Sequence, residues 1–207
     1  MIDVIAVTTA REARRAELDA VTIKTIAAIV TQRARAPRVT ARAIQARLAA
    51  LSKLERQGVT ILPARFGTVA ATPEELRERL APRAAALAAA LAHVRGRRQM
   101  TIHVAGRRPA PDRRSGAAYL ASRARAVRLP EADPARRAVR DFIVDERVES
   151  STRGRRLGAV HHLVEARDID AYVDALAALP APMRRRFSVT GPMPPFAFVP
   201  DAEEAFA

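Results

Sequence analysis

The chain of 207 residues contains no cysteine, which excludes disulfides and cysteine-ligated metal centres and fits a reducing compartment. Hydrophobic residues make up 49% of it but aromatic residues only 4%, so aliphatic side chains must fill the core. The longest apolar run, residues 84–92, falls far short of the roughly 20 residues that a membrane span needs. No signal peptide is recognisable at the N-terminus. These features predict a cytoplasmic protein that does not enter a membrane.

The formal net charge is +14, and almost all of the positive charge is arginine. One explanation is a basic face that binds nucleic acid or an acidic surface. The other is an arginine- and alanine-rich composition of genomic origin, in which arginine merely solvates the surface. The arginines are dispersed along the chain, which favours the second explanation.

The first 62 residues predict the element order β-α-β-β-α-β. Strands are expected at 1–7, 21–23, 26–31 and 59–62, and helices at 11–18 and 40–57. The second helix has Thr40 as its N-cap and Gly58 at its end. Its expected buried stripe consists of Ala41, Ile44, Leu48 and Leu51.

A long helix is predicted at 72–93, where it bridges two domains. Thr72 is suited to the N-cap, Pro73 to the first helical position, and Glu75 to a capping box. Pro82 lies inside the pattern and should kink or split the helix. The first domain is therefore expected to span residues 1–94.

The second domain is expected at 95–207 and repeats the order β-α-β-β-α-β. Its first strand, at 99–105, is followed by a polar loop at 107–114. At its C-terminal end the domain has a short acidic tail. Ser115 and Asp168 are predicted helix caps, and Pro180 ends the last helix. Helices are expected at 115–127, from 133, and at 168–179, with the other strands at 142–150, 157–166 and 187–190.

No catalytic constellation is recognisable. The sequence lacks a glycine-rich phosphate loop, a GxSxG elbow and an HExxH motif. His161 and His162 are neighbours on a predicted strand and should point to opposite faces, where they cannot easily share a metal. We expect no cofactor, no metal and no enzymatic activity.

Residues 61–69, ILPARFGTV, form a short apolar stretch between the two long helices. Pro63 removes a ladder donor, so the strand should end there or lie on a sheet edge. Gly67 permits a turn. Phe66 is expected in the core, and Arg65 is a candidate for a buried or interdomain ion pair.

A second apolar stretch, GPMPPFAFV, occupies residues 191–199. Its prolines exclude a central strand and favour an extended path. The stretch either packs on the body of the protein or forms a contact surface for an apolar partner. Its candidate residues are Gly191, Pro192, Met193, Pro194, Pro195, Phe196 and Phe198.

These two stretches resemble segments of the gas vesicle accessory proteins of the F/L family. LPARFGTV is similar to the family's LP-x-RFGT, and GPMPPFAFV to its GPWPPYSFV. Weaker similarities, SGAAYL at 115–120 and VHHLV at 160–164, lie between them in the family's order. This sequence departs from the family at Met193, where Trp is usual, and at Gln99, where Glu is frequent.

The two element orders are the split pattern of ferredoxin-like domains, so the sequence predicts an α+β fold of two ferredoxin-like units, and the resemblance implies the same fold. The resemblance also implies a non-enzymatic role in gas vesicle assembly, with the hydrophobic main shell protein and other accessory proteins as partners. An apolar shell subunit aggregates unless its face is covered before polymerisation, and the predicted apolar strip or an open sheet edge is suited to that task. The alternatives are a basic ferredoxin-like nucleic-acid-binding module, with arginine clusters at 95–98 and 184–186, and a small enzyme.

Overall fold

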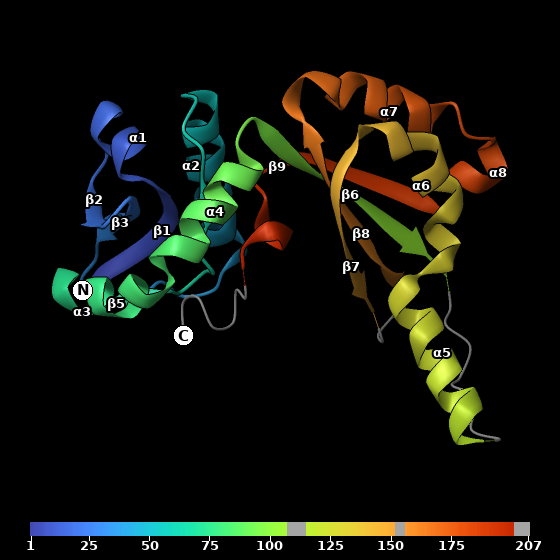
Figure 1. Ribbon diagram of the computed structural model, residues 1–207, viewed down its shortest axis with the longest axis horizontal. Helices are drawn as coiled ribbons and strands as arrows, with labels where there is room; N and C mark the ends of the chain where they lie inside the picture. The colour runs from blue at the N-terminus through green and yellow to red at the C-terminus, as the bar shows by residue number, and fades with distance from the viewer. Residues whose placement is uncertain (107–114, 152–155, 201–207) are drawn as a thin grey trace. The chain divides into compact units, whose positions relative to one another are not determined.

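A computed structural model describes residues 1–106, 115–151 and 156–200 of the chain (Figure 1). The chain forms two compact units. Among the described residues, the first contains Met1–Gly96 and residues 194–200, and the second lies within Arg97–Met193. The sequence-based boundary lay at 94/95 and assigned the whole C-terminus to the second unit. In the structure the chain leaves the first unit after Gly96 and returns to it at Pro194.

The sheet of the first unit is built around one buried strand. Strand β1 has seven buried residues out of eight, because the sheet is covered on both of its faces. All pairings are antiparallel in the order β2-β3-β1-β4, and β5 pairs with β1 as well. The strands are β1 (Ile2–Thr9), β2 (Ala20–Ile23), β3 (Ile26–Gln32), β4 (Leu62–Pro63) and β5 (Val69–Ala70).

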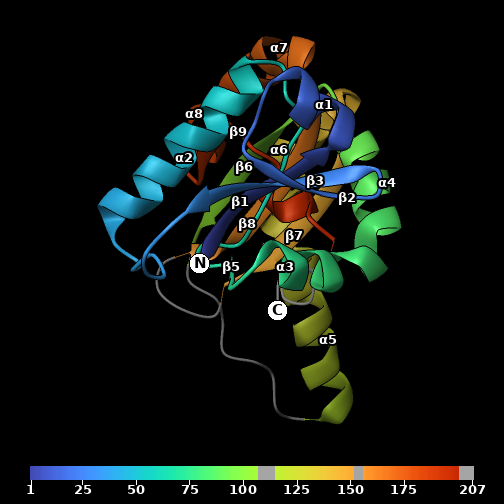
Figure 2. The same cartoon turned by 90° about the vertical axis from the view of Figure 1, so that its left-hand side faces the viewer.

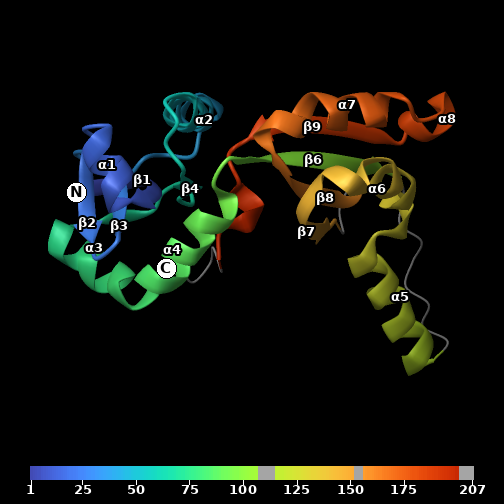
Figure 3. The ribbon, with the colours of Figure 1, turned by 45° about the horizontal axis from the view of Figure 1, so that its top comes forward.

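Helices α1 (Ala10–Arg15) and α2 (Ala41–Arg56) follow the first and third strands. Leu51 and Leu54 of α2 pack with Ile5 and Ile29 of the sheet in one apolar cluster. Figures 2 and 3 show α2 on one side of β1 and β3, with α3 (Pro73–Leu80) and α4 (Ala84–Val94) on the other. The second layer buries the side chains of Leu76, Leu80, Leu87, Leu91 and Val94.

Pro82 splits the predicted long helix, as expected. A 3-10 turn, η1 (Ala81–Arg83), separates α3 from α4. The predicted start is also confirmed: the backbone N–H of Glu75 donates to the Thr72 hydroxyl at 3.2 Å. The Glu75 carboxylate in turn accepts from the backbone N–H of Ala71 at 2.7 Å. Both parts of this helix pack on the sheet of the first unit.

The predicted buried stripe of α2 is wrong in its N-terminal half. Ile44 and Leu48 are each 41% exposed, and Ala41 is exposed too. The buried residues are Arg47, Leu51 and Leu54. The helix is rotated because Arg47 reaches a carboxylate in the sheet, which a pattern of apolar residues does not register.

The second unit has four antiparallel strands in the order β7-β8-β6-β9. Counted along the chain, both sheets have the spatial order second, third, first, fourth strand. The central pair, β6 and β8, holds most of the buried positions, and the edge strand β9 is largely exposed. The strands are β6 (Arg97–Ala105), β7 (Ile143–Ser150), β8 (Arg156–Glu165) and β9 (Phe187–Met193).

Helices cover one face of this second sheet. Met100 and Ile102 of β6 pack with Val139 of α6 (Asp133–Val139) and with Tyr172 and Leu176 of α7 (Ile169–Ala177). Helix α5 (Gly116–Arg128) extends away from the sheet in Figures 1 and 3. None of its described side chains belongs to the apolar clusters of this unit.

Several elements differ from the sequence-based prediction. The expected strand at 59–62 is reduced to β4 and is followed by the unpredicted β5. A short helix, α8 (Ala181–Arg184), was also missed. Asp168 stands at the start of α7 but forms no capping hydrogen bond with its side chain. The predicted loop at 107–114 and the acidic tail lie outside the described residues. None of the described helices combines the length and the apolarity that a membrane crossing demands.

Candidate interaction surfaces

The stretch at 61–69 forms the end of the first sheet and a turn. Pro63 pairs with Ala6 in β4, the outermost strand of the order, so its predicted edge position is confirmed. Gly67 has a φ of +89°, a backbone conformation that favours glycine. The backbone N–H of Thr68 donates to the carbonyl of Arg65 at 3.2 Å and closes the turn.

Arg65 and Phe66 differ in their surroundings. Arg65 is exposed, so the buried ion pair expected of it is not formed there. Phe66 is half-buried, and the guanidinium of Arg47 lies 5.3 Å from the centre of its ring. The motif phenylalanine is therefore a cation–π partner of a buried arginine that lies outside the motif.

Arg47 forms the buried ion pair of the first unit. Its Nη2 lies 2.6 Å from Oδ1 of Asp3, and its Nη1 donates to the carbonyl of Val4 at 2.7 Å. Arg33 donates to the other Asp3 oxygen at 2.8 Å. The side chain of Asp3 is fully buried, so two guanidinium groups compensate a charge that water cannot reach. Sequence reasoning missed this pair. The signal was available in β1, where Asp3 is the only charged residue and Thr8 and Thr9 are the only other polar ones.

The C-terminal stretch contributes mostly to the first unit's interior. Pro194, Pro195 and Phe198 are buried, whereas Phe196 is 36% exposed. The last two belong to a 3-10 turn, η5 (Phe196–Phe198), which contacts β4. The expected extended path is thus interrupted by a turn, and that turn sends one phenylalanine inward and the other toward solvent.

Gly191 and Pro192 lie on the edge strand β9, which accommodates proline as expected. Gly191 has a φ of +129°, and a Cβ there would lie 2.8 Å from the carbonyl oxygen of Gln99 and 2.8 Å from the sulfur of Met100. Only glycine permits this approach to β6. Met193 pairs with Gln99 in the ladder, and the side-chain amide of Gln99 lies 3.7 Å from the Met193 sulfur.

A polar cluster lies on one face of the second sheet. The hydroxyl of Thr101 lies 3.0 Å from Nδ1 of His161, and the side-chain amide of Gln99 lies 3.0 Å from that hydroxyl and 3.2 Å from the same ring nitrogen. Burial lowers the pKa of His161, against the opposing effect of Glu149, whose carboxylate is 3.4 Å from Nε2. Gln99 and Thr101 are both buried.

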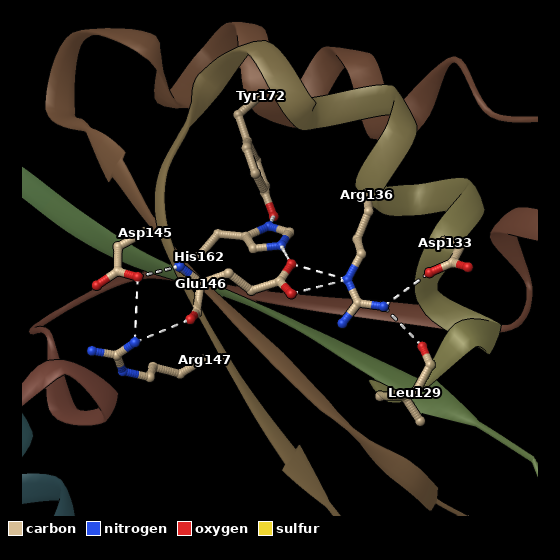
Figure 4. Close-up of polar contacts among 8 residues, drawn as sticks. All are labelled: Leu129, Asp133, Arg136, Asp145, Glu146, Arg147, His162 and Tyr172. Atoms are coloured by element: carbon tan, nitrogen blue, oxygen red, sulfur yellow. Dashed lines mark hydrogen bonds and ion pairs between the residues drawn. The ribbon is translucent and has the colours of Figure 1, made fainter. Parts of the chain in front are cut away.

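A second polar chain lies on the helix-covered face (Figure 4). The carboxylate of Glu146 accepts two hydrogen bonds from Nε of Arg136, at 2.9 and 3.1 Å. Nε2 of His162 lies 2.9 Å from the same carboxylate, and its Nδ1 lies 2.8 Å from the hydroxyl of Tyr172. Both His162 and Tyr172 are fully buried.

Protonation in this chain is set by the carboxylate. Burial disfavours the ionised form of Glu146, but hydrogen bonds with His162 and Arg136 outweigh it and lower its pKa to about 2. An ionised carboxylate only accepts, so Nε2 of His162 carries a hydrogen and Nδ1 can accept the O–H of Tyr172. Burial, and then the charge of Glu146, raises the pKa of Tyr172 well above its usual range.

The order carboxylate, imidazole, hydroxyl matches that of catalytic triads. Here the hydroxyl belongs to Tyr172, which has no exposed surface and a raised pKa, so no substrate can reach it and it is a poor nucleophile. We therefore assign a structural role to this hydrogen-bonded chain of side chains, which holds α7 and α6 against the sheet.

The histidines do not form a metal site. His161 points into the polar cluster, and the adjacent His162 points to the helices, as their places on a strand predict. Within residues 1–106, 115–151 and 156–200, no group of three or more potential ligands is close enough to hold a metal ion.

Helix α2 presents an apolar row to solvent. Val39 is 75% exposed, and Ile44 and Leu48, one turn apart, are 41% exposed. Val39 precedes the N-cap Thr40 by one residue and Ile44 is the fourth helical residue, which are the positions of a hydrophobic staple. A hydrophobic staple accounts for Val39 and Ile44, but it does not account for the exposed Leu48.

The basic cluster at 95–98 is partly engaged within the protein. Residues 184–186 are exposed, and Arg184 donates to the carbonyl of Ala177 at 2.9 Å. Arg95 lies 3.7 Å from the carboxylate of Glu12, and Arg97 pairs with Glu165 at 2.9 Å. Among the strands described, Phe187 is the only phenylalanine, tyrosine or tryptophan, and it packs against an apolar cluster under the helices. These strands offer no row of exposed phenylalanine, tyrosine or tryptophan side chains on which bases could stack.

Two crystal structures of gas vesicle proteins share this fold. GvpF from Microcystis aeruginosa superposes with a TM-score of 0.66 at 14% identity, over 86% of this chain and 87% of that one. GvpF from Anabaena sp. PCC7120 gives 0.66 at 13% identity, over 86% and 84%. No significant match was found among curated proteins.

The sequence profile of the family "Gas vesicle synthesis protein GvpL/GvpF" matches residues 6–200. The chain therefore belongs to the GvpL/GvpF family of gas vesicle proteins, and its α+β fold and the resemblance of its two motif stretches agree with that membership.

Proposed function

We propose that this protein is a non-enzymatic assembly factor that binds the hydrophobic main shell subunit during gas vesicle formation, together with other accessory proteins. The observation that carries the proposal is family membership over residues 6–200. The burial of the Tyr172 hydroxyl, the potential nucleophile of the Glu146–His162–Tyr172 chain, agrees with a protein that acts by contact. Its place of action would be the cytoplasm, at the growing vesicle.

We further propose that each unit is a modified ferredoxin-like domain. The support is the β-α-β-β-α-β succession and the common strand order in both sheets. The first domain would be completed by η5 after the chain returns from the second, so the domain boundaries would lie near 96/97 and 193/194.

The proposed contact surfaces for the shell subunit are the exposed parts of two segments. One is the apolar row of α2, formed by Val39, Ile44 and Leu48. The other is Phe196, the outward-facing aromatic residue of the C-terminal stretch. Pro63, Gly67, Gly191 and Phe198 would support the fold around these surfaces rather than touch the partner.

Salt dependence separates this proposal from nucleic-acid binding. Apolar contact stabilises by about 25 cal/mol per Å² buried, before association costs, and is little affected by moderate salt. Binding to phosphates weakens by several powers of ten for six or more contacts over the same range, through counterion release. We expect tight, salt-tolerant binding to the purified shell protein and weak, salt-labile binding to RNA. Tight binding to RNA with a steep salt slope would contradict the proposal.

The structure separates two variants that would otherwise be confounded. Phe196→Ser removes an exposed ring, so the protein should stay folded and lose affinity for the shell subunit. Phe198→Ser removes a buried ring and should lower the melting temperature. Val189→Ser, at a residue that is 40% exposed on β9, is the matched control. Wild-type vesicle formation by folded Phe196→Ser, and by Ile44→Ser with Leu48→Ser, would exclude these surfaces.

A further inference from the structure

Helix α5 turns its larger aliphatic side chains to solvent. Leu120 is 65% exposed and Val127 is 63% exposed. Leu129 caps the C-terminal end of the helix, and its side chain is buried in an apolar cluster of the second unit. A helix of this length is marginally stable in water without tertiary packing. α5 therefore carries a packing face that its own unit does not use.

Four exposed apolar residues of α5 form a seam, and Tyr119 and Ala121 are exposed beside it. Ala117, Leu120, Ala124 and Val127 are all exposed and follow one another at intervals of three, four and three residues. This is the spacing of the contact positions in a helix pair, in which two residues of every seven face the partner. Helices that lie on membranes bury a broader apolar face. The two alanines also allow another helix to approach closely.

The charged residues of α5 itself have one sign. The helix contains Arg123, Arg125 and Arg128 and no acidic residue. Arg125 lies 3.3 Å from the carboxylate of Glu131, which follows the helix in the chain. A second copy of the same helix would bring like charges together, so the seam does not suit self-association. A helix with carboxylates beside its apolar positions would be attracted.

We propose that the seam of Ala117, Leu120, Ala124 and Val127 is the docking site for one amphipathic helix of a partner protein, whose apolar stripe is flanked by aspartate or glutamate. This inference goes beyond the proposed function, because it specifies the chemistry of the partner helix whichever protein carries it. The seam shares no residue with the surfaces proposed for the shell subunit, so either proposal can fail alone.

Two synthetic peptides test the charge rule. Both have three heptads with leucine at the contact positions; one has glutamate and the other lysine at the flanking positions. Fluorescence anisotropy with the full-length protein should show the glutamate peptide binding about tenfold or more tightly than the lysine peptide, since flanking charges set partner choice. Failure to bind the glutamate peptide, or equal binding of both, would overturn the proposal.

Variants locate the binding on the seam. Leu120→Gln with Val127→Gln keeps good helix formers at both positions and should weaken binding of the glutamate peptide at least tenfold. Val173→Gln, at a residue 43% exposed on α7, is the matched control and should bind as the wild type does. Arg128→Glu should shift the preference toward the lysine peptide. Circular dichroism checks that each variant is folded.

Two further outcomes would assign the seam to another occupant and overturn the proposal. One is binding to phosphatidylcholine vesicles that contain phosphatidylserine, lost in the double glutamine variant, without binding to the glutamate peptide. The other is a concentration-dependent dimer in sedimentation that the same variant abolishes.

Discussion

The two units share a strand order but bury polar groups in different ways. In the first, the carboxylate itself is sealed: Asp3 is fully buried between two arginines, and Arg47 is nearly so. In the second, the carboxylate of Glu146 is 30% exposed, and the fully buried members are His162 and Tyr172. The first arrangement depends on a buried ion pair. In the second, the exposure of the side chains falls from the partly exposed carboxylate to the fully buried imidazole and hydroxyl. The same sheet order thus accommodates networks that should fail in different ways.

The largest effect is expected from Arg47→Met, which leaves the buried Asp3 with one partly exposed arginine. Removing one partner of a buried pair costs about 3–5 kcal/mol. Urea unfolding should show that loss for the first unit. Arg65→Met, at an exposed arginine of the same unit, should change stability by less than about 0.5 kcal/mol. Equal effects of the two variants would show that the ion pair is not a determinant of stability.

Acid should affect the second network next. The pKa of Glu146 lies at about 2 in the folded protein, against 4.5 for an unperturbed glutamate. Its contribution is therefore present above about pH 5 and is lost as pH falls toward 2. Because the group is partly exposed, we expect a contribution on the order of 2 kcal/mol.

The test compares wild type with Glu146→Gln by urea unfolding from pH 7 to pH 2.5. The wild type should be more stable at neutral pH, and the gap should narrow as pH falls below 5. A gap that stays constant across this range would refute the pKa assignment, since other carboxylates titrate in both proteins.

A smaller effect is expected at the buried end of the chain. Tyr172→Phe removes the hydroxyl and leaves Nδ1 of His162 without its partner, which costs about 1–3 kcal/mol. Tyr119→Phe, at the exposed tyrosine of α5, should have no effect on thermal unfolding. If Tyr172→Phe were equally silent, water or another group would have to satisfy the imidazole.

The smallest difference concerns helix caps. Thr72→Ala removes the cap of α3, a packed helix, and should lower global stability by about 1 kcal/mol. Ser115→Ala removes the corresponding bond of α5, where the backbone N–H of Ala118 donates to Ser115 at 3.1 Å. Since α5 is little packed, its fraying should increase without a change in global unfolding. Hydrogen exchange of α5 amides and urea unfolding measure the two effects separately.

Local chemistry allowed much of the fold to be predicted from sequence. The β-branched runs of β2 and β3, the caps Thr40, Thr72 and Ser115, and the break at Pro82 depend on neighbours in the chain. In the two proline-containing stretches, Pro63 was placed correctly at a sheet edge and the prolines at 192–195 were correctly excluded from a central strand, because proline cannot donate to a ladder. The class of protein followed from their resemblance to family segments.

Long-range pairing could not be predicted in the same way. Arg47 looked like one more surface arginine of an amphipathic helix, because periodicity records polarity and not the partner that a side chain reaches. The hydrogen bond between His162 and Tyr172 joins a strand to a helix, and no local sequence pattern predicts it. Phe196 is exposed and Phe198 is buried because both belong to a 3-10 turn, which was not predicted since the neighbouring prolines favour an extended path. The candidate interaction residues therefore remain proposals.

The return of the chain to the first unit has a consequence for synthesis on the ribosome. The second unit is an insertion whose ends meet, since Gln99 and Met193 are ladder partners in β6 and β9. Once the second unit has folded, its 97 residues, Arg97–Met193, behave as a short closed loop inserted into the first unit. The entropic cost of closing a long flexible loop has then largely been met, so it no longer opposes docking of the C-terminal segment onto the first unit. Until Phe198 has been translated, however, the first unit lacks part of its interior. Apolar surface near β4 stays uncovered during that interval, so a nascent chain that stalls after residue 193 should need a chaperone even though both sheets have been made.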